Sequence, residues 1–300
     1  ADHCDGPVAV ALVEEDVRQV WIVGEELSVG VGSLRQGDIL GREGLSGLVD
    51  AIAIVPEDPD AMHVDACLCG FMIPFVSKLG YEVPIWDFRA KGVTSISADV
   101  HKYGYAAKGA STVSYRDAAL RKHQFYAYPD WPGGLYVTPT MAGARPGGAV
   151  AAAWAVMHHL GEEGYVELAK AAMDATNRIK AGIESIAGLR IMGEPHMSVF
   201  AFDSDEVNVF ALGEKMDERG WHLDRNQFPS ALHMMVTPAH ADVTEQLLAD
   251  LEAAMNEARE SPASSAEGMA ALYGAAAAMP DRGAVSDFAI GFMDQLYTIS

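Results

Sequence analysis

The chain is poor in cysteine and lacks long hydrophobic runs, and each shortage argues against a class of protein. Three cysteines occur among 300 residues, at positions 4, 67 and 69, so we expect no disulfide framework and a reducing, cytoplasmic location. No apolar run approaches the roughly 18 residues that a membrane-spanning helix needs. The apolar stretch at residues 7–13 has acidic neighbours, whereas a secretory signal begins with basic residues. We therefore expect no membrane association encoded in this chain.

Basic residues are also scarce. The 21 Lys and Arg stand against 42 Asp and Glu, which gives a net charge of −21. Nucleic-acid backbones are bound by clustered Lys and Arg, so we expect no nucleic-acid partner. A small phosphorylated ligand is still compatible with this charge, because a local basic pocket can lie on an acidic surface.

What the chain does contain is the alternation of strands and helices that is typical of an α/β fold. Half of its residues are hydrophobic, enough for a large core. β-Branched and apolar runs predict strands at residues 61–66, 93–98, 111–115, 198–202 and 232–237. Apolar periodicity predicts helices at 45–55, 149–187, 206–219, 243–259 and 285–297. Polar residues follow several strands, so we expect a site at the carboxyl edge of the sheet.

The segment SISADVHKYGYAAKG, residues 95–109, is the strongest candidate for chemistry. Lys102 lies just after a predicted strand, where a half-buried amine can act as a nucleophile. His101 is adjacent and Lys108 follows six positions later, and we expect such cationic neighbours and burial to lower the pKa of Lys102. The alternative is that both lysines are solvated loop residues.

A second candidate is Asp65, at the end of the predicted strand in MHVDACLCG. The alternative role for this carboxylate is a turn or helix cap. Together with Lys102, however, Asp65 makes the pair that a pyridoxal-phosphate site requires, a covalent anchor and a partner for the protonated pyridine nitrogen. Cys67 and Cys69 form a C-x-C pair with no second pair nearby, so we expect no metal site.

Three segments resemble the sphingosine-1-phosphate lyase family, in the group II branch of pyridoxal-phosphate decarboxylases. They are MHVDACLCG (62–70), FRAKGVTSISADVHKYGYAAKG (88–109) and DWPGGLYVTPTMAGARPGG (130–148). The resemblance covers roughly residues 60–300 and implies an aspartate-aminotransferase-like α/β fold. It divides the chain into a poorly matching head (1–60), the carboxyl-terminal part of the cofactor-binding large domain (61–150), and a small domain with a helical tail (151–300). The amino-terminal cofactor-binding half of the family has no counterpart here, and Cys69 stands where relatives have a glycine.

The resemblance also implies roles for individual residues. Lys102 matches the lysine that binds the cofactor covalently, and Asp65 matches the partner of the pyridine nitrogen. His101 matches a histidine that touches the cofactor phosphate, and Lys108 matches a second lysine that handles the substrate phosphate or a proton. Tyr105 lies between the two lysines and is expected to line the pocket. Cofactor contacts across a dimer are implied for Thr138, Thr140 and Arg145.

The implied reaction is a retro-aldol cleavage of a phosphorylated sphingoid base into a long-chain aldehyde and phosphoethanolamine. The resemblance implies pyridoxal phosphate as the cofactor, a small phosphorylated amino alcohol as the substrate, and a homodimer. Two alternatives stay open. One is an amino-acid decarboxylase of the same family, and the other is a non-catalytic fragment or dimerisation partner.

Overall fold

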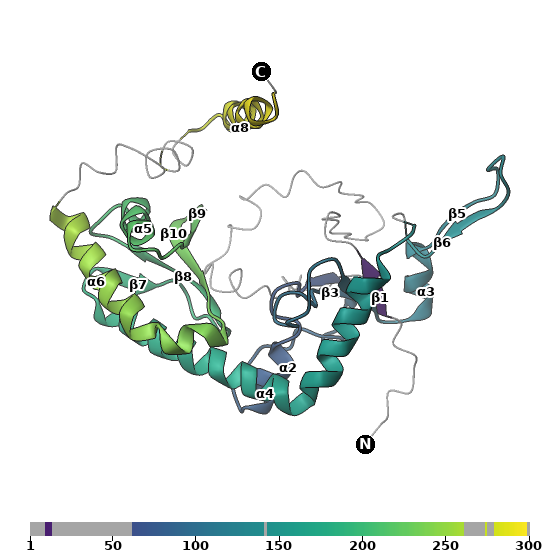
Figure 1. The fold of residues 1–300 in the computed structure, drawn as a ribbon, viewed down its shortest axis with the longest axis horizontal. Helices are drawn as coiled ribbons and strands as arrows, with labels where there is room; N and C mark the ends of the chain where they lie inside the picture. Colours follow the sequence, from purple (N-terminus) through teal and green to yellow (C-terminus); the bar gives the residue numbers. More distant parts are fainter. Residues whose placement is uncertain (1–9, 14–61, 141–142, 261–273, 275–278, 299–300) are drawn as a thin grey trace. The chain divides into compact units, whose positions relative to one another are not determined.

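The structure is a computed structural model that describes residues 10–13, 62–140, 143–260, 274 and 279–298. The helix expected at residues 45–55 lies outside these ranges. The chain divides into two compact units, residues 1–173 with 195–197 and residues 174–194 with 198–300. Each unit has its own four-stranded sheet (Figure 1).

The sheet of the first unit has the strand order β1-β4-β3-β2. Its strands are β1 (Val10–Val13), β2 (Met62–Asp65), β3 (Val93–Ala98) and β4 (Ser111–Tyr115). Only β2 and β3 form a parallel pair, and their register sets Asp65 opposite Ser97. Because parallel strands end at the same edge, Asp65 and the turn after Ala98 meet there. This edge is where the sequence predicts the site.

A close approach of the backbone holds the segment after β2 against the sheet. Gly70 precedes helix α2 (Ile73–Lys78), and a Cβ at this position would lie 2.7 Å from Ala66 O and 2.8 Å from Ala98 Cβ. Any side chain would therefore push the segment away from the sheet. Cys69, beside it, is fully buried, so the larger side chain found here in place of a glycine packs into the core.

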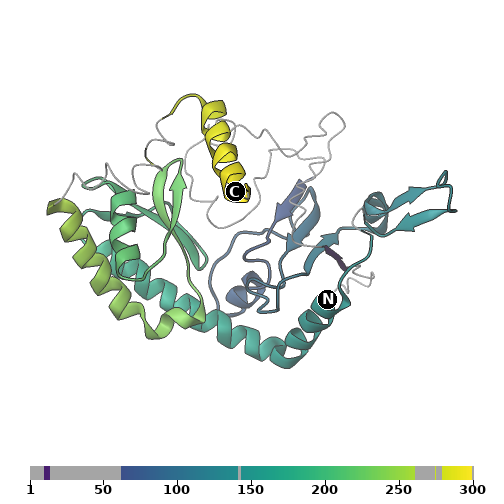
Figure 2. The same ribbon diagram turned by 45° about the horizontal axis from the view of Figure 1, so that its top comes forward.

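A hairpin follows the sheet, and the sequence did not predict it. The short helices α3 (Ala118–Arg121) and η2 (Lys122–Gln124) lead into β5 (Tyr126–Tyr128) and β6 (Tyr136–Thr138). The hairpin extends away from the sheet of its unit (Figure 2). It exposes large apolar side chains, namely Phe125, Tyr126, Tyr128, Trp131, Leu135, Tyr136 and Val137.

The long helix α4 (Gly147–Ser185) contributes its first part to the first unit and its last part to the second. It is interrupted at Gly161, which has φ 56° and ψ −171°, a conformation outside the helical region. Tyr165, beyond this kink, stacks on Phe75 of α2 with ring centroids 5.0 Å apart. That contact ties the helix to the segment that follows β2.

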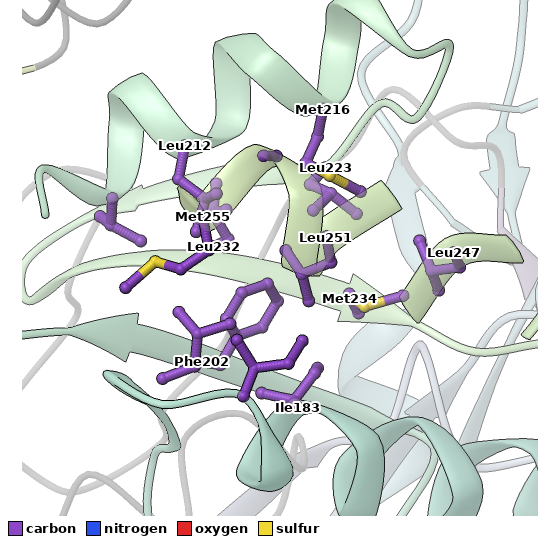
Figure 3. Packing of buried hydrophobic residues seen from close by; sticks show 14 of the residues in the cluster. Ile183, Phe202, Leu212, Met216, Leu223, Leu232, Met234, Leu247, Leu251 and Met255 are labelled. Carbon is purple, nitrogen blue, oxygen red and sulfur yellow. The ribbon is translucent and has the colours of Figure 1, made fainter. Parts of the chain in front are cut away.

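The sheet of the second unit is antiparallel throughout, in the order β7-β8-β10-β9. Its strands are β7 (Leu189–Ile191), β8 (Val199–Ser204), β9 (Asp224–Gln227) and β10 (Ser230–Met235). Helices α5 (Val209–Glu218) and α6 (Thr244–Glu260) and the end of α4 pack their apolar faces around it (Figure 3). Between β10 and α6 lies the 3-10 helix η3 (Pro238–Asp242), and α8 (Arg282–Tyr297) comes last. None of the helices in the described ranges combines the length and the apolar composition that crossing a bilayer requires.

Candidate active site

Lys102 lies in the turn that follows β3, with its side chain half-buried. Its Nζ is 2.8 Å from Asp99 Oδ2 and donates a hydrogen bond to Cys67 Sγ at 3.1 Å. The backbone N–H of Lys102 donates to Asp99 O at 3.3 Å, so the turn itself brings the amine onto the carboxylate. Lys102 is therefore held by defined partners, unlike a lysine that only faces solvent.

These partners decide the protonation state of the amine. Burial lowers the pKa of Lys102, but the hydrogen bonds to Asp99 and Cys67 outweigh burial and leave the pKa above its ordinary value. The sequence-based expectation of a lowered pKa is therefore wrong, because the charged group that contacts the amine is a carboxylate. The structure holds Lys102 as an ammonium ion.

Asp65 ends β2 and is exposed at the sheet edge. Its Oδ1 accepts hydrogen bonds from the Cys67 backbone N–H and from Ser97 Oγ, each at 3.1 Å. Desolvation raises the pKa of Asp65, but hydrogen bonds from Cys67 and Ser97 outweigh it and the pKa lies below its ordinary value. The hydrogen bond from the Cys67 N–H stabilises the turn after β2. A turn was one of the two alternative roles that the sequence left open for Asp65. The N-cap of α2, however, is Met72, so Asp65 does not cap that helix.

Cys67 lies between the two predicted residues. Its thiol interacts both with the amine of Lys102 and with the carboxylate of Asp65. Burial is the main cause that raises the pKa of Cys67, so the sulfur is a neutral thiol. The structure thus brings Lys102 and Asp65, which are 37 positions apart in the sequence, to the same thiol.

His101 and Tyr105 are fixed beside Lys102 by other contacts. The ring of His101 is 5% exposed, Nδ1 donates to Ala110 O at 3.2 Å, and Nε2 lies 3.8 Å from Asp99 Oδ2. Tyr105 has φ 58°, a conformation that bulky residues rarely adopt. Its ring packs between Tyr103 and Tyr165, with centroid distances of 6.4 Å to each. Burial raises the pKa of Tyr105 to about 12, and its hydroxyl is buried without a hydrogen-bond partner in the described part of the chain.

The remaining predicted residues are not brought against Lys102 or Asp65 by any contact within the described ranges. Lys108 is exposed. Thr138 and Thr140 are buried at the end of β6, where Thr138 Oγ1 donates to Thr140 O at 2.8 Å. Arg145 Nη1 donates to Gly143 O at 2.7 Å, while its Nε and Nη2 are buried and unpaired in the described residues. Thr140 Oγ1, which is also buried without a partner in the described ranges, and these two nitrogens of Arg145 are polar atoms that a ligand or a second chain could bind.

Two groups near Lys102 were missed by the sequence reasoning. Asp99 accepts from both Lys102 and Ser111 Oγ, and the available signal was its place three residues before the lysine in a predicted turn. Cys67 was considered only as a metal ligand.

The cavity of about 570 Å³ in the second unit, lined in part by Asn208, Phe228 and Ser230, contains none of the predicted site residues.

Replacing Asp99 with asparagine is expected to lower the pKa of Lys102. A carboxylate that stabilises the ammonium form is lost while burial, which favours the neutral amine, remains. More of the amine is then neutral at a given pH, so its reaction with an acylating reagent should occur at lower pH. Competitive labelling across pH with peptide mapping measures this shift. Asp87→Asn, which alters an exposed pair with Arg89, is the control. An unchanged labelling profile for Lys102 would show that Asp99 does not set its pKa.

Comparisons with known proteins identify similar sequences and structures. Residues 48–204 match the model of the pyridoxal-dependent decarboxylase conserved domain. Sphingosine-1-phosphate lyase of Arabidopsis thaliana is 48% identical over 235 residues, which are 78% of this chain and 43% of that protein. A probable L-tyrosine/L-aspartate decarboxylase of Methanothermobacter thermautotrophicus is 31% identical over 242 residues, which are 79% of this chain and 64% of that protein.

A solved structure supports the same relationship. The sphingosine-1-phosphate lyase of Burkholderia pseudomallei superposes with a TM-score of 0.68 at 38% identity, over 79% of this chain and 50% of that chain. The comparison confirms the predicted α/β fold of the pyridoxal-phosphate enzymes. The chain spans about half the length of the sphingosine-1-phosphate lyases it matches.

Proposed function

Because the chain belongs to the pyridoxal-dependent decarboxylase family, we propose that it acts as a pyridoxal-phosphate-dependent carbon–carbon lyase. The proposed reaction cleaves a phosphorylated sphingoid base into a long-chain aldehyde and phosphoethanolamine. The observation that carries the proposal is that Lys102 and Asp65 both interact with the thiol of Cys67, where β2 and β3 end together. The 48% identity to a plant sphingosine-1-phosphate lyase supports the choice of substrate.

The residues at this edge fit pyridoxal phosphate. Lys102 offers an amine for covalent attachment, and Asp65 offers an ionised, exposed carboxylate for the protonated pyridine nitrogen. The unpaired hydroxyl of Tyr105 provides a further donor for a ligand. When bound, the cofactor supplies the electron sink that carbon–carbon cleavage needs. His101, Thr138, Thr140 and Arg145 are proposed to contact its phosphate or to complete the site across a dimer.

The protonation states of two groups bear on the proposed reaction. Lys102 must lose a proton before its nitrogen can bond to an aldehyde carbon, and Asp99 Oδ2, at 2.8 Å from Nζ, opposes that loss because it stabilises the ammonium ion. Tyr105, with its pKa raised to about 12 by burial, stays protonated at neutral pH. It would therefore donate a hydrogen bond instead of acting as a base. The exposed amine of Lys108 is proposed to bind the substrate phosphate.

A homodimer and a cytoplasmic location complete the proposal. The exposed apolar side chains of the β5–β6 hairpin supply a surface that a second copy could cover. Cys67 and Cys69 form no disulfide within the described part of the chain, which is compatible with a reducing compartment.

Turnover of a phosphorylated sphingoid base is the direct test. We expect the purified chain with added pyridoxal phosphate to release long-chain aldehyde and phosphoethanolamine in equal amounts. Mass spectrometry of both products measures this, and a parallel assay follows carbon dioxide released from tyrosine and aspartate. Carbon dioxide without aldehyde would support the second candidate, an amino-acid decarboxylase, which the 31% identity to the archaeal protein favours. A folded chain that releases neither product would support the non-catalytic alternative.

A further inference from the structure

His63 lies on β2, two residues before Asp65, and links it to the neighbouring strand. The parallel register of β2 and β3 sets His63 opposite Ser95 and Asp65 opposite Ser97. Side chains two residues apart in a strand share one face, so these four side chains point the same way. His63 Nδ1 lies 2.8 Å from Ser95 Oγ, and His63 Nε2 lies 3.2 Å from Ser97 Oγ. Ser97 Oγ in turn donates to Asp65 Oδ1 at 3.1 Å.

Counting protons gives this network a single direction. An ionised carboxylate can only accept, so the one hydroxyl proton of Ser97 is directed to Asp65. Ser97 Oγ must then accept from His63, which requires a proton on Nε2. In a neutral ring Nδ1 is consequently the acceptor, and it receives the hydroxyl proton of Ser95. One tautomer of a neutral histidine therefore satisfies all three contacts.

The environment of His63 agrees with that neutral state. Burial lowers the pKa of His63 and outweighs the nearby charge of Asp65, which raises it. A protonated ring would place a proton on Nδ1 and would force the hydroxyl of Ser95 to turn away. The chain of donors consequently runs from Ser95 through His63 and Ser97 to the carboxylate.

We propose that His63 is a positioning residue for Asp65, acting through Ser97 to fix the orientation and ionised state of the carboxylate at the cofactor's pyridine nitrogen. The part that concerns the cofactor rests on the proposed function. The coupling of His63 to Asp65 is a property of the chain itself. The hydrogen bond from His63 Nε2 to Ser97 Oγ leaves the hydroxyl proton of Ser97 directed to Asp65, which is how the ring of His63 acts on the carboxylate.

The coupling is tested first in the chain without added cofactor. Carbon-13 labelling of aspartate and an NMR titration follow the pKa of Asp65 in His63→Leu, Ser97→Ala, the double variant and the exposed control His123→Leu. We expect the pKa of Asp65 to rise in both single variants and to rise no further in the double variant, because His63 acts through Ser97. His63→Gln, whose amide can donate to Ser97, should restore a lower value. An unchanged pKa in His63→Leu, or additive effects in the double variant, would overturn the proposal.

The link to the ring nitrogen is tested with two ligands, pyridoxal phosphate and an analogue with carbon in place of the pyridine nitrogen. His63→Leu should weaken binding of pyridoxal phosphate by roughly 3- to 10-fold, the range for one neutral hydrogen bond, and should leave the analogue unaffected. Equal weakening of both ligands would overturn the positioning role, since a merely structural defect affects them alike. If the unmodified chain binds neither ligand, the proposed function fails, while the titration of Asp65 still decides the coupling.

Discussion

Lys102→Ala is expected to abolish covalent attachment of pyridoxal phosphate and to leave the fold intact. The amine of Lys102 is the group that the turn after β3 presents to Asp99 and Cys67, and an alanine offers no nucleophile there. Turnover should fall by about 10⁴-fold or more, the scale observed when a covalent nucleophile is removed. The loss of a partly exposed ion pair should cost only about 1 kcal/mol of stability.

Absorbance of the bound cofactor, followed by borohydride reduction and peptide mapping, measures the attachment. The matched control is Lys108→Ala, which removes an exposed lysine six positions later in the same segment and should keep the visible band. Thermal unfolding of both variants shows whether the fold is retained. Persistence of the band in Lys102→Ala, or a label mapped to Lys108, would contradict the assignment of Lys102.

The elements next to Lys102 were predictable because their sequence signal is local. The β-branched runs at 93–98 and 111–115 form β3 and β4 with those bounds, and the helix expected at 149–187 is α4 at Gly147–Ser185. The missed strands are short and lie at edges: β7 and β9 flank their sheet and have three and four residues. So few residues carry little periodicity. The β5–β6 hairpin adjoins a stretch rich in Pro and Gly, and such a composition indicates loops instead of paired strands.

The site was predictable only in part, for a different reason. Lys102 and Asp65 are recognisable because each follows a predicted strand and lies in a segment that resembles the sphingosine-1-phosphate lyase family. Their partners depend on geometry that no linear pattern displays. His63 reaches Asp65 only through the parallel register with β3. Asp99 reaches Lys102 only because the chain turns between them, and that contact reverses the expected direction of the pKa shift.

Asp65→Asn is expected to lower turnover by roughly 10²- to 10⁴-fold, the range associated with loss of one acid–base partner. An asparagine keeps an oxygen that can accept from the Cys67 N–H and from Ser97 Oγ, so the local turn should survive. The amide carries no charge, however, and cannot stabilise a protonated pyridine nitrogen. Steady-state kinetics with the phosphorylated sphingoid base measures the loss. Binding of the carbon analogue of the cofactor should be nearly unchanged.

Asp87→Asn is the matched control for this change. Asp87 is also a carboxylate of the first unit that accepts from the backbone N–H two residues on, in its case Arg89, and its pKa is likewise lowered in spite of desolvation. It pairs with an arginine outside the site, so its substitution should leave turnover intact. The lowered pKa of Asp65 keeps its carboxylate ionised well below neutral pH. Activity of the unmodified chain should therefore not decline through this group between neutral and mildly acidic pH. Normal turnover in Asp65→Asn would mean that another group holds the ring nitrogen.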